Sequence, residues 1–326
     1  MDAVYTDFAK AFDKCETGVL IHRLKDCGVM VVMGRMGHWL AAFLDPSVRM
    51  QAVGVEGRLS DLSSVVSGVP QGTVLGPCLF LIHLMGISRS VSSETGVSSF
   101  ADDTRLLRGI VSEEDCVALQ QDLDHVYSWA EEIGMVFNAG KFELLRFWLD
   151  RDTAPDILYM APDGGPIEEK DCLRDLGVRV STDLTFSTQI DMVVESGSCM
   201  AGWALRTFRR SGSLIQPRLD YFSQLWSPRD QSSINRQESV QRQFISHIRD
   251  DSLVGMNYWD RLSHLRVYSQ ERRRERYQIC FLWKETQGLI SGYEIKCQLS
   301  DRRVRLAVPH QIPCDAPSRV NKAMRA

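Results

Sequence analysis

The sequence lacks several features that mark whole classes of protein. Its nine cysteines are scattered and form no C-x-x-C pair, which argues against a zinc ribbon or a small disulfide scaffold and indicates reduced thiols. The longest apolar run, residues 74–87, contains Gly, Pro and His and is shorter than the roughly 20 residues that cross a bilayer. The first 14 residues contain acids and lysines but no apolar stretch like that of a signal peptide. We therefore expect a soluble intracellular protein that is neither secreted nor bound to a membrane.

Charge is present but unevenly distributed, which the net value of −4 conceals. Residues 1–205 contain 16 basic against 30 acidic side chains, whereas residues 206–326 contain 22 against 12. Within residues 206–276 all 14 basic residues are Arg, and they face eight acids. Planar arginine side chains suit bidentate contact with phosphate, but a helical domain with solvated arginine faces explains the pattern equally well.

Short β-like runs and longer helical patterns alternate along the chain, whose 326 residues suffice for about two ordinary domains. The β-like runs are Ala3–Phe8, Val97–Phe100 and Thr104–Leu107. The clearest helix is expected from Glu113 to Ile133, because apolar residues recur every three or four positions between a capping Ser112 and a terminating Gly134. This mixture predicts an α+β fold.

The second half of the chain has a different character. Residues 150–166 are rich in Asp, Pro and Gly and predict a loop or hairpin. From about Thr188 the pattern is helical, and residues 237–248 place Val240, Phe244 and Ile248 on one helix face. After Ser300 the apolar periodicity fades, which predicts a loose tail.

Three aspartates are candidates for metal-dependent chemistry. Asp7 follows a β-like run, and Asp102 and Asp103 stand between two others, so we expect all three at one edge of a small antiparallel sheet. Nucleotidyl transfer uses two hard cations, one at the attacking 3′-hydroxyl and one at the triphosphate, and magnesium prefers oxygen ligands. An Asp doublet is, however, more often a solvated turn.

A glycine-rich segment, SGVPQGTVLGPCLFL (67–81), adds to these aspartates. Its glycines at 68, 72 and 76 allow close approach of the backbone to a ligand. Gln71 offers a neutral amide to a base or sugar edge. The same composition also occurs in ordinary loops.

The order of these segments resembles the reverse transcriptases of LINE-type (non-LTR, jockey-like) retrotransposons. YTDFAKAFDK, SGVPQGTVLGPCLFLI, FADDTRLL and MVFNAGKFE (135–143) are similar to motifs A, B, C and D, and DLGVRV (175–180) to the following primer-grip segment. The resemblance continues through residues 219–283 and covers about residues 1–290.

The resemblance implies a role for each matching residue. The implied catalytic and metal-binding residues are Asp7, Asp102 and Asp103. The implied nucleotide-binding residues are Phe8, Phe12, Gln71, Gly72 and Lys141, with Phe12 as the steric gate against a ribose 2′-hydroxyl and Lys141 near the triphosphate. The implied primer-grip residues are Leu176 and Gly177.

The resemblance also implies an activity and an architecture. The activity is RNA-directed DNA synthesis by a nucleotidyltransferase with two Mg²⁺ ions, or Mn²⁺, on an RNA template with a DNA primer and deoxynucleoside triphosphates, in the nucleus or cytoplasm. The fold is a right-hand polymerase palm, an antiparallel sheet with packed helices, over residues 1–185. A helical, Arg-rich thumb-like region would follow over 186–290 and a loose tail over 291–326.

Motif A lies at the start of the chain, so we expect an N-terminally truncated enzyme without its fingers. Residues 1–326 alone should then show little or no primer extension, and a related fingers domain fused upstream should restore it. The alternative is a non-catalytic nucleic-acid-binding remnant of a truncated or decayed element. An RNA-dependent RNA polymerase shares the palm but fits Phe12 and residues 219–283 less well.

Overall fold

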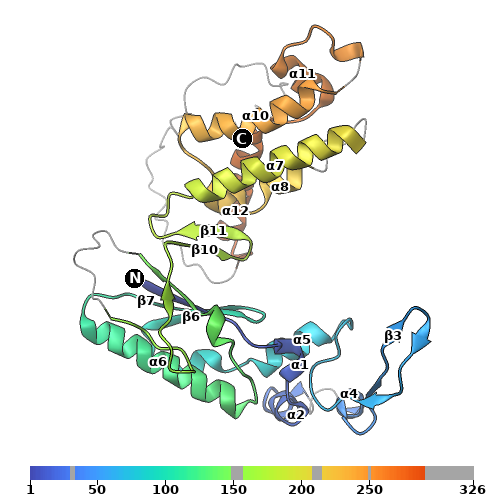
Figure 1. The fold of residues 1–326 in the computed structure, drawn as a ribbon, viewed down its shortest axis with the longest axis vertical. Helices are drawn as coiled ribbons and strands as arrows, with labels where there is room; N and C mark the ends of the chain where they lie inside the picture. Colours follow the sequence, from blue (N-terminus) through green and yellow to red (C-terminus); the bar gives the residue numbers. More distant parts are fainter. Residues whose placement is uncertain (30–33, 148–156, 208–214, 249–250, 291–326) are drawn as a thin grey trace. The chain divides into compact units, whose positions relative to one another are not determined.

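A computed structural model of the chain describes residues 1–29, 34–147, 157–207, 215–248 and 251–290 (Figure 1). The chain divides into two compact units. The first consists of Met1–Asp175 and Val180–Leu184, and the second of Leu176–Arg179 and the residues from Thr185 onward. Each unit buries apolar residues of its own.

The first unit is built on a five-stranded sheet whose strand order is β6-β7-β1-β8-β9. Its strands are β1 (Asp2–Thr6), β6 (Thr95–Phe100), β7 (Asp103–Arg108), β8 (Glu143–Arg146) and β9 (Glu168–Glu169). All neighbouring pairs are antiparallel except β8 with β9. The expected strands are therefore present, although the first ends at Thr6 and does not extend to Phe8 as expected. The antiparallel sheet with packed helices confirms the α+β fold class.

The central strand β1 is buried on both faces, since successive side chains in a strand point to opposite sides. Val4 and Leu106 face the main core, which includes the apolar stripe of α6 (Glu113–Glu132). Ala3 and Leu145 face the opposite side, where they meet Leu173. Both faces of the central strand are therefore covered.

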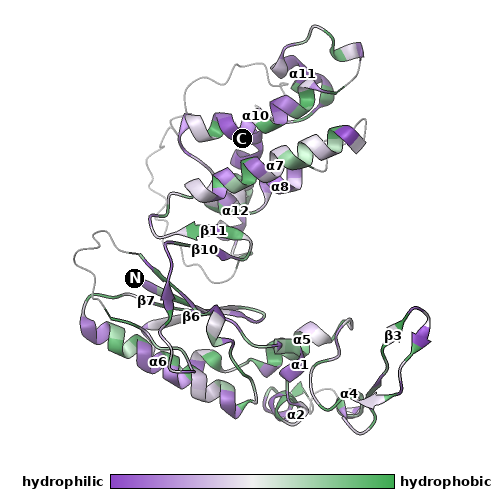
Figure 2. Ribbon diagram, in the orientation of Figure 1, coloured by the Kyte–Doolittle hydropathy of each residue, from purple (hydrophilic) through white to green (hydrophobic). Residues whose placement is uncertain are grey.

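Helix α6 agrees with its prediction to within one residue. Ser112 and Asp115 form a reciprocal capping box at its start, and Gly134, with φ of +72°, follows its end. Leu119 and Leu123 are fully buried, as their helical spacing requires. Figure 2 shows apolar and hydrophilic residues mixed along this helix, as expected for an element with one buried face.

Shorter elements complete the first unit. Its other helices are α1 (Ala11–Lys14), α2 (Thr17–Asp26), α4 (Arg35–Leu44) and α5 (Gly76–His83), with a short turn of 3₁₀ helix at Ile87–Arg89. Two small antiparallel pairs are β2 (Met50–Gln51) with β5 (Ser63–Ser64) and β3 (Gly54–Val55) with β4 (Arg58–Leu59). Helices α1, α2 and α5 lie together in Figure 1 and contribute Leu20 and Phe80 to the main core.

A two-stranded sheet of β10 (Cys172–Asp175) and β11 (Val178–Ser181) contains the boundary between the units. The second unit is otherwise helical, as expected from about residue 188. Its helices are α7 (Ser187–Thr207), α8 (Gln216–Asp220), α9 (Ser223–Trp226), α10 (Gln231–Ser246), α11 (Tyr258–Leu265) and α12 (Gln270–Thr286), with a 3₁₀ turn at Asp251–Leu253.

The core of the second unit contains Val240 and Phe244 of α10. Ile248 lies just beyond the end of that helix and packs against the same core. Within the described parts of the chain, no helix is long and apolar enough to cross a membrane. The tail expected at residues 291–326 lies outside the described residues, as do residues 150–156 of the loop or hairpin expected at 150–166. The described remainder of that segment contains an isolated antiparallel bridge between Met160 and Pro166.

Candidate active site

The three aspartates lie at one edge of the sheet because of its register. Strand β1 ends at Thr6, opposite Thr104 of β7, and Phe100 at the end of β6 pairs with Asp103. Asp7 is the residue after β1, and Asp102 lies in the tight turn between β6 and β7. The expected convergence of strand ends is therefore present, while the catalytic role of the three residues stays a prediction.

The turn that carries the doublet contains a strained residue. Ala101 has a φ of +55°, a left-handed conformation that residues with a Cβ rarely adopt. Such strain costs on the order of 1–3 kcal/mol and persists only where the surrounding structure enforces it, often at functional sites. Here the antiparallel pairing of β6 with β7 on either side enforces it.

Lys141 reaches the same edge through the segment that follows α6. The Asn138 N–H donates to the Asp7 carbonyl at 2.8 Å, and Phe137 stacks on Phe8 with ring centroids 4.3 Å apart. A turn of 3₁₀ helix at Ala139–Lys141 then places the Lys141 side chain next to Asp7. Its ammonium lies 2.8 Å from Oδ2 of Asp7, although the two residues are 134 positions apart in sequence.

The electrostatics indicate that these four side chains interact. Burial raises the pKa of the Asp103 carboxyl, and the charges of Asp102 and Asp7 raise it further while Lys141 opposes them. The pKa of the Lys141 ammonium is raised by its hydrogen bond to Asp7, by the charge of Asp7 and then by Asp102 and Asp103. The edge therefore concentrates negative charge that one lysine only partly compensates.

This donor set fits a divalent cation by its chemistry. All three acidic groups offer oxygen ligands from neighbouring strand ends, which is what Mg²⁺ and Mn²⁺ bind, and the Lys141 ammonium on Asp7 shows that a cation is attracted there. Among the described residues, no three His, Cys, Asp or Glu side chains are already arranged around a position that could hold a metal ion.

The glycine-rich loop of residues 67–76 is fastened to the segment that follows the aspartate strand. The Val69 N–H donates to the carbonyl of Phe12 at 2.9 Å, and the Phe12 ring stacks on Phe80 of α5 with centroids 4.3 Å apart. Gly68 has a φ of +88°, and a Cβ placed on it would lie 2.9 Å from the Phe12 carbonyl oxygen. Only glycine permits this approach without a shift.

Asp13 is a residue of this region that sequence reasoning missed. Its carboxylate accepts a 2.6 Å hydrogen bond from Nε2 of Gln71. An ionised carboxylate only accepts, so the amide nitrogen of Gln71 is directed to Asp13 and its oxygen is turned away. The run F-D after the aspartate strand carried no signal for this contact, because the partners are separated by 58 positions. Gly72, with φ of +74°, has open space around it.

Two sets of expected site residues lie elsewhere. Phe8 is 2% exposed and belongs to the main core, so its side chain is not available to a nucleotide. Leu176 and Gly177 form the turn between β10 and β11 and belong to the second unit. The structure therefore groups the aspartates with Lys141, and Phe12 with Gln71, within the first unit.

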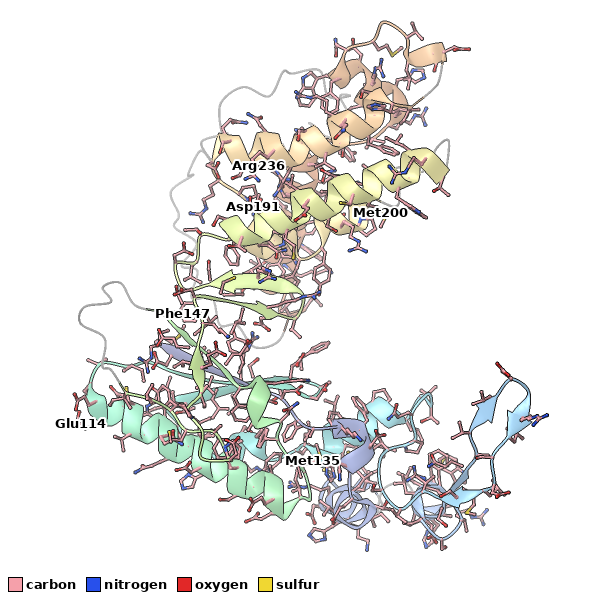
Figure 3. The ribbon with its side chains drawn as sticks, viewed as in Figure 1. Glu114, Met135, Phe147, Asp191, Met200 and Arg236 are labelled. Carbon is pink, nitrogen blue, oxygen red and sulfur yellow. The ribbon has the colours of Figure 1, made fainter. Side chains whose placement is uncertain are left out.

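Several arginines of the second unit form polar contacts with side chains of the same unit. Arg236 of α10 and Asp191 of α7 form an ion pair at 2.6 Å (Figure 3). Arg273 pairs with Asp220, and Arg274 is buried and donates to Gln237. The contacts of Arg273 and Arg274 therefore belong to the fold of the second unit, whereas the Arg236–Asp191 pair is exposed. Contact of the Arg-rich region with phosphate stays a prediction.

All cysteines in the described part of the chain are free, in agreement with the expected reduced thiols. Cys15 is buried, and burial raises the pKa of its thiol to about 12. A thiol that stays protonated at neutral pH is a weak nucleophile and a weak metal ligand. The chemistry of this region therefore rests on its carboxylates.

Comparison with known proteins places these features in a family. A family model described as reverse transcriptase (RNA-dependent DNA polymerase) matches residues 3–180. The chain is 24% identical over 256 residues to a probable RNA-directed DNA polymerase from transposon X-element of Drosophila melanogaster, covering 74% of this chain and 27% of the relative. It is 23% identical over 265 residues to the RNA-directed DNA polymerase from mobile element jockey of the same species, covering 75% and 28%. The chain thus spans about a quarter of the length of these relatives.

Solved structures with some similarity include two telomerases. Apo telomerase from Candida tropicalis aligns with a TM-score of 0.38 and 8% identity, covering 81% of this chain and 45% of that one. Telomerase from Candida albicans in complex with a fragment of telomeric RNA aligns with a TM-score of 0.32 and 12% identity, covering 77% and 48%.

Proposed function

The chain belongs to the reverse transcriptase (RNA-dependent DNA polymerase) family, and on this basis we propose that its first unit is the palm of an RNA-directed DNA polymerase of a non-LTR retrotransposon. The observation that supports the proposal most is the placement of Asp7, Asp102 and Asp103 at one sheet edge, with Lys141 paired with Asp7. We propose the palm over residues 1–185 and a thumb-like region over 186–290.

Members of this family use divalent metal ions, and the finer proposal is a pair of Mg²⁺ ions that Mn²⁺ can replace. Asp7 and Asp102 would hold them, and Asp103 would add a further carboxylate. When bound, the ions would activate a primer 3′-hydroxyl and neutralise charge on the triphosphate of an incoming deoxynucleotide. The partners that follow are an RNA template and a DNA primer.

The other residues would act by orienting the substrates. Phe12, held against Phe80, would limit the space beside the sugar and so disfavour a ribose 2′-hydroxyl. Gln71, whose amide nitrogen is occupied by Asp13, would present its oxygen to the nucleotide. Lys141 would stabilise negative charge on the triphosphate as bonds break. Gly72 would leave room for close backbone approach.

Metal binding tests the proposed site directly. We expect the chain to bind Mn²⁺, measured as loss of the electron paramagnetic resonance signal of the free ion, and Asp102→Asn to weaken this binding at least tenfold. Asp124→Asn is the matched control, since Asp124 is an exposed carboxylate of α6 that contacts Gln120. Equal Mn²⁺ affinity of the wild type and Asp102→Asn, with circular dichroism unchanged, would contradict the proposed site.

Primer extension tests the activity. We expect a fusion of residues 1–326 to the upstream segment of a related reverse transcriptase to extend a DNA primer on an RNA template with Mg²⁺. Asp102→Ala should abolish extension, because phosphoryl transfer depends on metal positioning. A folded fusion that binds Mn²⁺ but extends no primer would favour a non-catalytic nucleic-acid-binding protein instead.

A further inference from the structure

The turn between β10 and β11 has an unusual backbone. Leu176 has a φ of +45° and Gly177 a φ of +88°, so both residues of the two-residue connection are left-handed. This is the backbone of a tight hairpin turn, for which Asn-Gly or Gly-Gly is preferred and Leu is not. Leucine in this conformation is strained, and the residue is 38% exposed.

One side chain from a distant segment holds this turn in place. The hydroxyl of Tyr221 donates to the carbonyl oxygen of Leu176 at 2.8 Å. The same ring covers Gly177 so closely that a Cβ on that glycine would lie 3.3 Å from its Cε1. Tyr221 thus contacts both residues of the turn, one by a hydrogen bond and the other by ring packing.

Tyr221 is itself fixed by the second unit's core. Its carbonyl accepts a 2.9 Å hydrogen bond from the indole N–H of Trp226, which is 1% exposed. On its other side Asp220 is held by Arg273, and Leu219 is buried in the same core. Tyr221 is nevertheless 53% exposed. A residue that is anchored through its backbone, is half exposed and bonds the turn through its hydroxyl suits positioning better than core packing.

We propose that Tyr221 is a positioning residue that holds the Leu176–Gly177 turn in the shape that contacts the sugar-phosphate backbone of a primer end. The proposal rests on the proposed function, which assigns this turn to the primer grip. Strained backbone that neighbouring contacts enforce is typical of functional sites, and here the strain and the enforcing contact are both exposed. Loss of the Tyr221 hydroxyl should let the turn relax while the core remains intact.

The experiment compares two binding affinities for each variant of the full chain. Fluorescence anisotropy gives the Kd for a labelled RNA template that carries an annealed DNA primer, whose 3′ end lies within the template sequence. It also gives the Kd for the same RNA without the primer. Tyr221→Phe keeps the ring on Gly177 and loses only the hydroxyl. We expect its preference for the primed template to fall about fivefold, which corresponds to about 1 kcal/mol, the worth of one hydrogen bond.

A matched control and a second variant separate positioning from stability. Tyr277→Phe removes a phenolic hydroxyl that bonds Asp220 instead of the turn, so it should keep the wild-type preference. Gly177→Ala places a Cβ against the Tyr221 ring and should reduce the preference from the other side of the contact. In hydrogen–deuterium exchange, Tyr221→Phe should deprotect residues 172–181 without lowering the melting temperature by more than a few degrees.

The outcomes distinguish this inference from the proposed function. A wild-type chain with no preference for the primed template would overturn the primer-binding function and the role of Tyr221 with it. A wild-type preference that Tyr221→Phe and Gly177→Ala both leave unchanged would overturn the role of Tyr221 alone. A selective fall in both variants, with Tyr277→Phe unaffected, would establish it.

Discussion

Acid should destabilise the first unit through His83, which lies in α5 directly after the glycine-rich loop. The side chain is fully buried, and burial together with the nearby charge of Arg23 lowers its pKa from 6.5 to about 4. Between pH 6.5 and pH 4 the imidazole of His83 is therefore protonated in the unfolded state but stays neutral in the folded state. The folded state has its full stability above pH 6.5 and loses free energy of unfolding as the pH falls from 6.5 towards 4.

The magnitude follows from the two pKa values. A difference of about 2.5 units corresponds to about 3 kcal/mol once the pH is below both values, and about 2 kcal/mol of it is lost between pH 7 and pH 5. Other groups also titrate in this range, so the contribution of His83 has to be isolated by difference. The leucine in His83→Leu cannot be protonated, so this variant should lack the loss of about 2 kcal/mol that His83 causes between pH 7 and pH 5.

The assay is urea unfolding at pH 7, 6 and 5, followed by the fluorescence of tryptophans such as the buried Trp129 of α6. We expect the free energy of unfolding of the wild type, relative to His83→Leu, to fall by about 2 kcal/mol from pH 7 to pH 5. His22→Leu, at an exposed histidine of α2, is measured in the same way as the control for replacing an imidazole outside the core. Parallel pH profiles for the wild type and His83→Leu would refute the reasoning.

Two further predictions concern packing around the site, and both are measured by urea unfolding at pH 7. Gly68→Ala and Gly72→Ala both place a Cβ on a left-handed backbone, but only at Gly68 does the Cβ meet a backbone oxygen, at 2.9 Å. Gly68→Ala should therefore lower the free energy of unfolding by about 1–3 kcal/mol more than Gly72→Ala. Equal losses in the two variants would contradict this. Asp122 is 3% exposed, accepts hydrogen bonds at 2.8 Å and lies 3.5 Å from Arg108. Asp122→Ala should therefore lower the free energy of unfolding by about 3–5 kcal/mol, whereas Asp124→Ala, on the exposed face of α6, should lower it by about 0.5 kcal/mol or less. Similar losses in the two variants would contradict the stabilising role of the buried Asp122–Arg108 pair.

Features that depend on residues close together in sequence were predictable. Helix α6 could be placed to within one residue, because its apolar spacing, its capping serine and its terminating Gly134 are all local signals. The strands that flank Asp7 and Asp102 could be placed for the same reason. The order of the motifs was likewise readable, and it led to the family that the comparisons then showed.

Contacts between distant segments were not predictable, even where the residues themselves had been singled out. Lys141 was expected near the triphosphate, but its ion pair with Asp7 depends on the path of the chain after α6. Phe8 was expected to bind nucleotide, yet its ring stacks on Phe137, because backbone hydrogen bonds join the segment after β1 to the segment after α6.

The sequence by itself determined where helices and strands form and which residue types are available for chemistry, because propensity, periodicity and capping act over a few residues. Only the tertiary structure decided which of those residues meet. Sheet register brought Asp7 beside Asp103, and core packing placed Tyr221 against the turn at Leu176. Neither contact follows from spacing along the chain, since each depends on the packing of whole elements whose mutual positions are fixed only when the core closes.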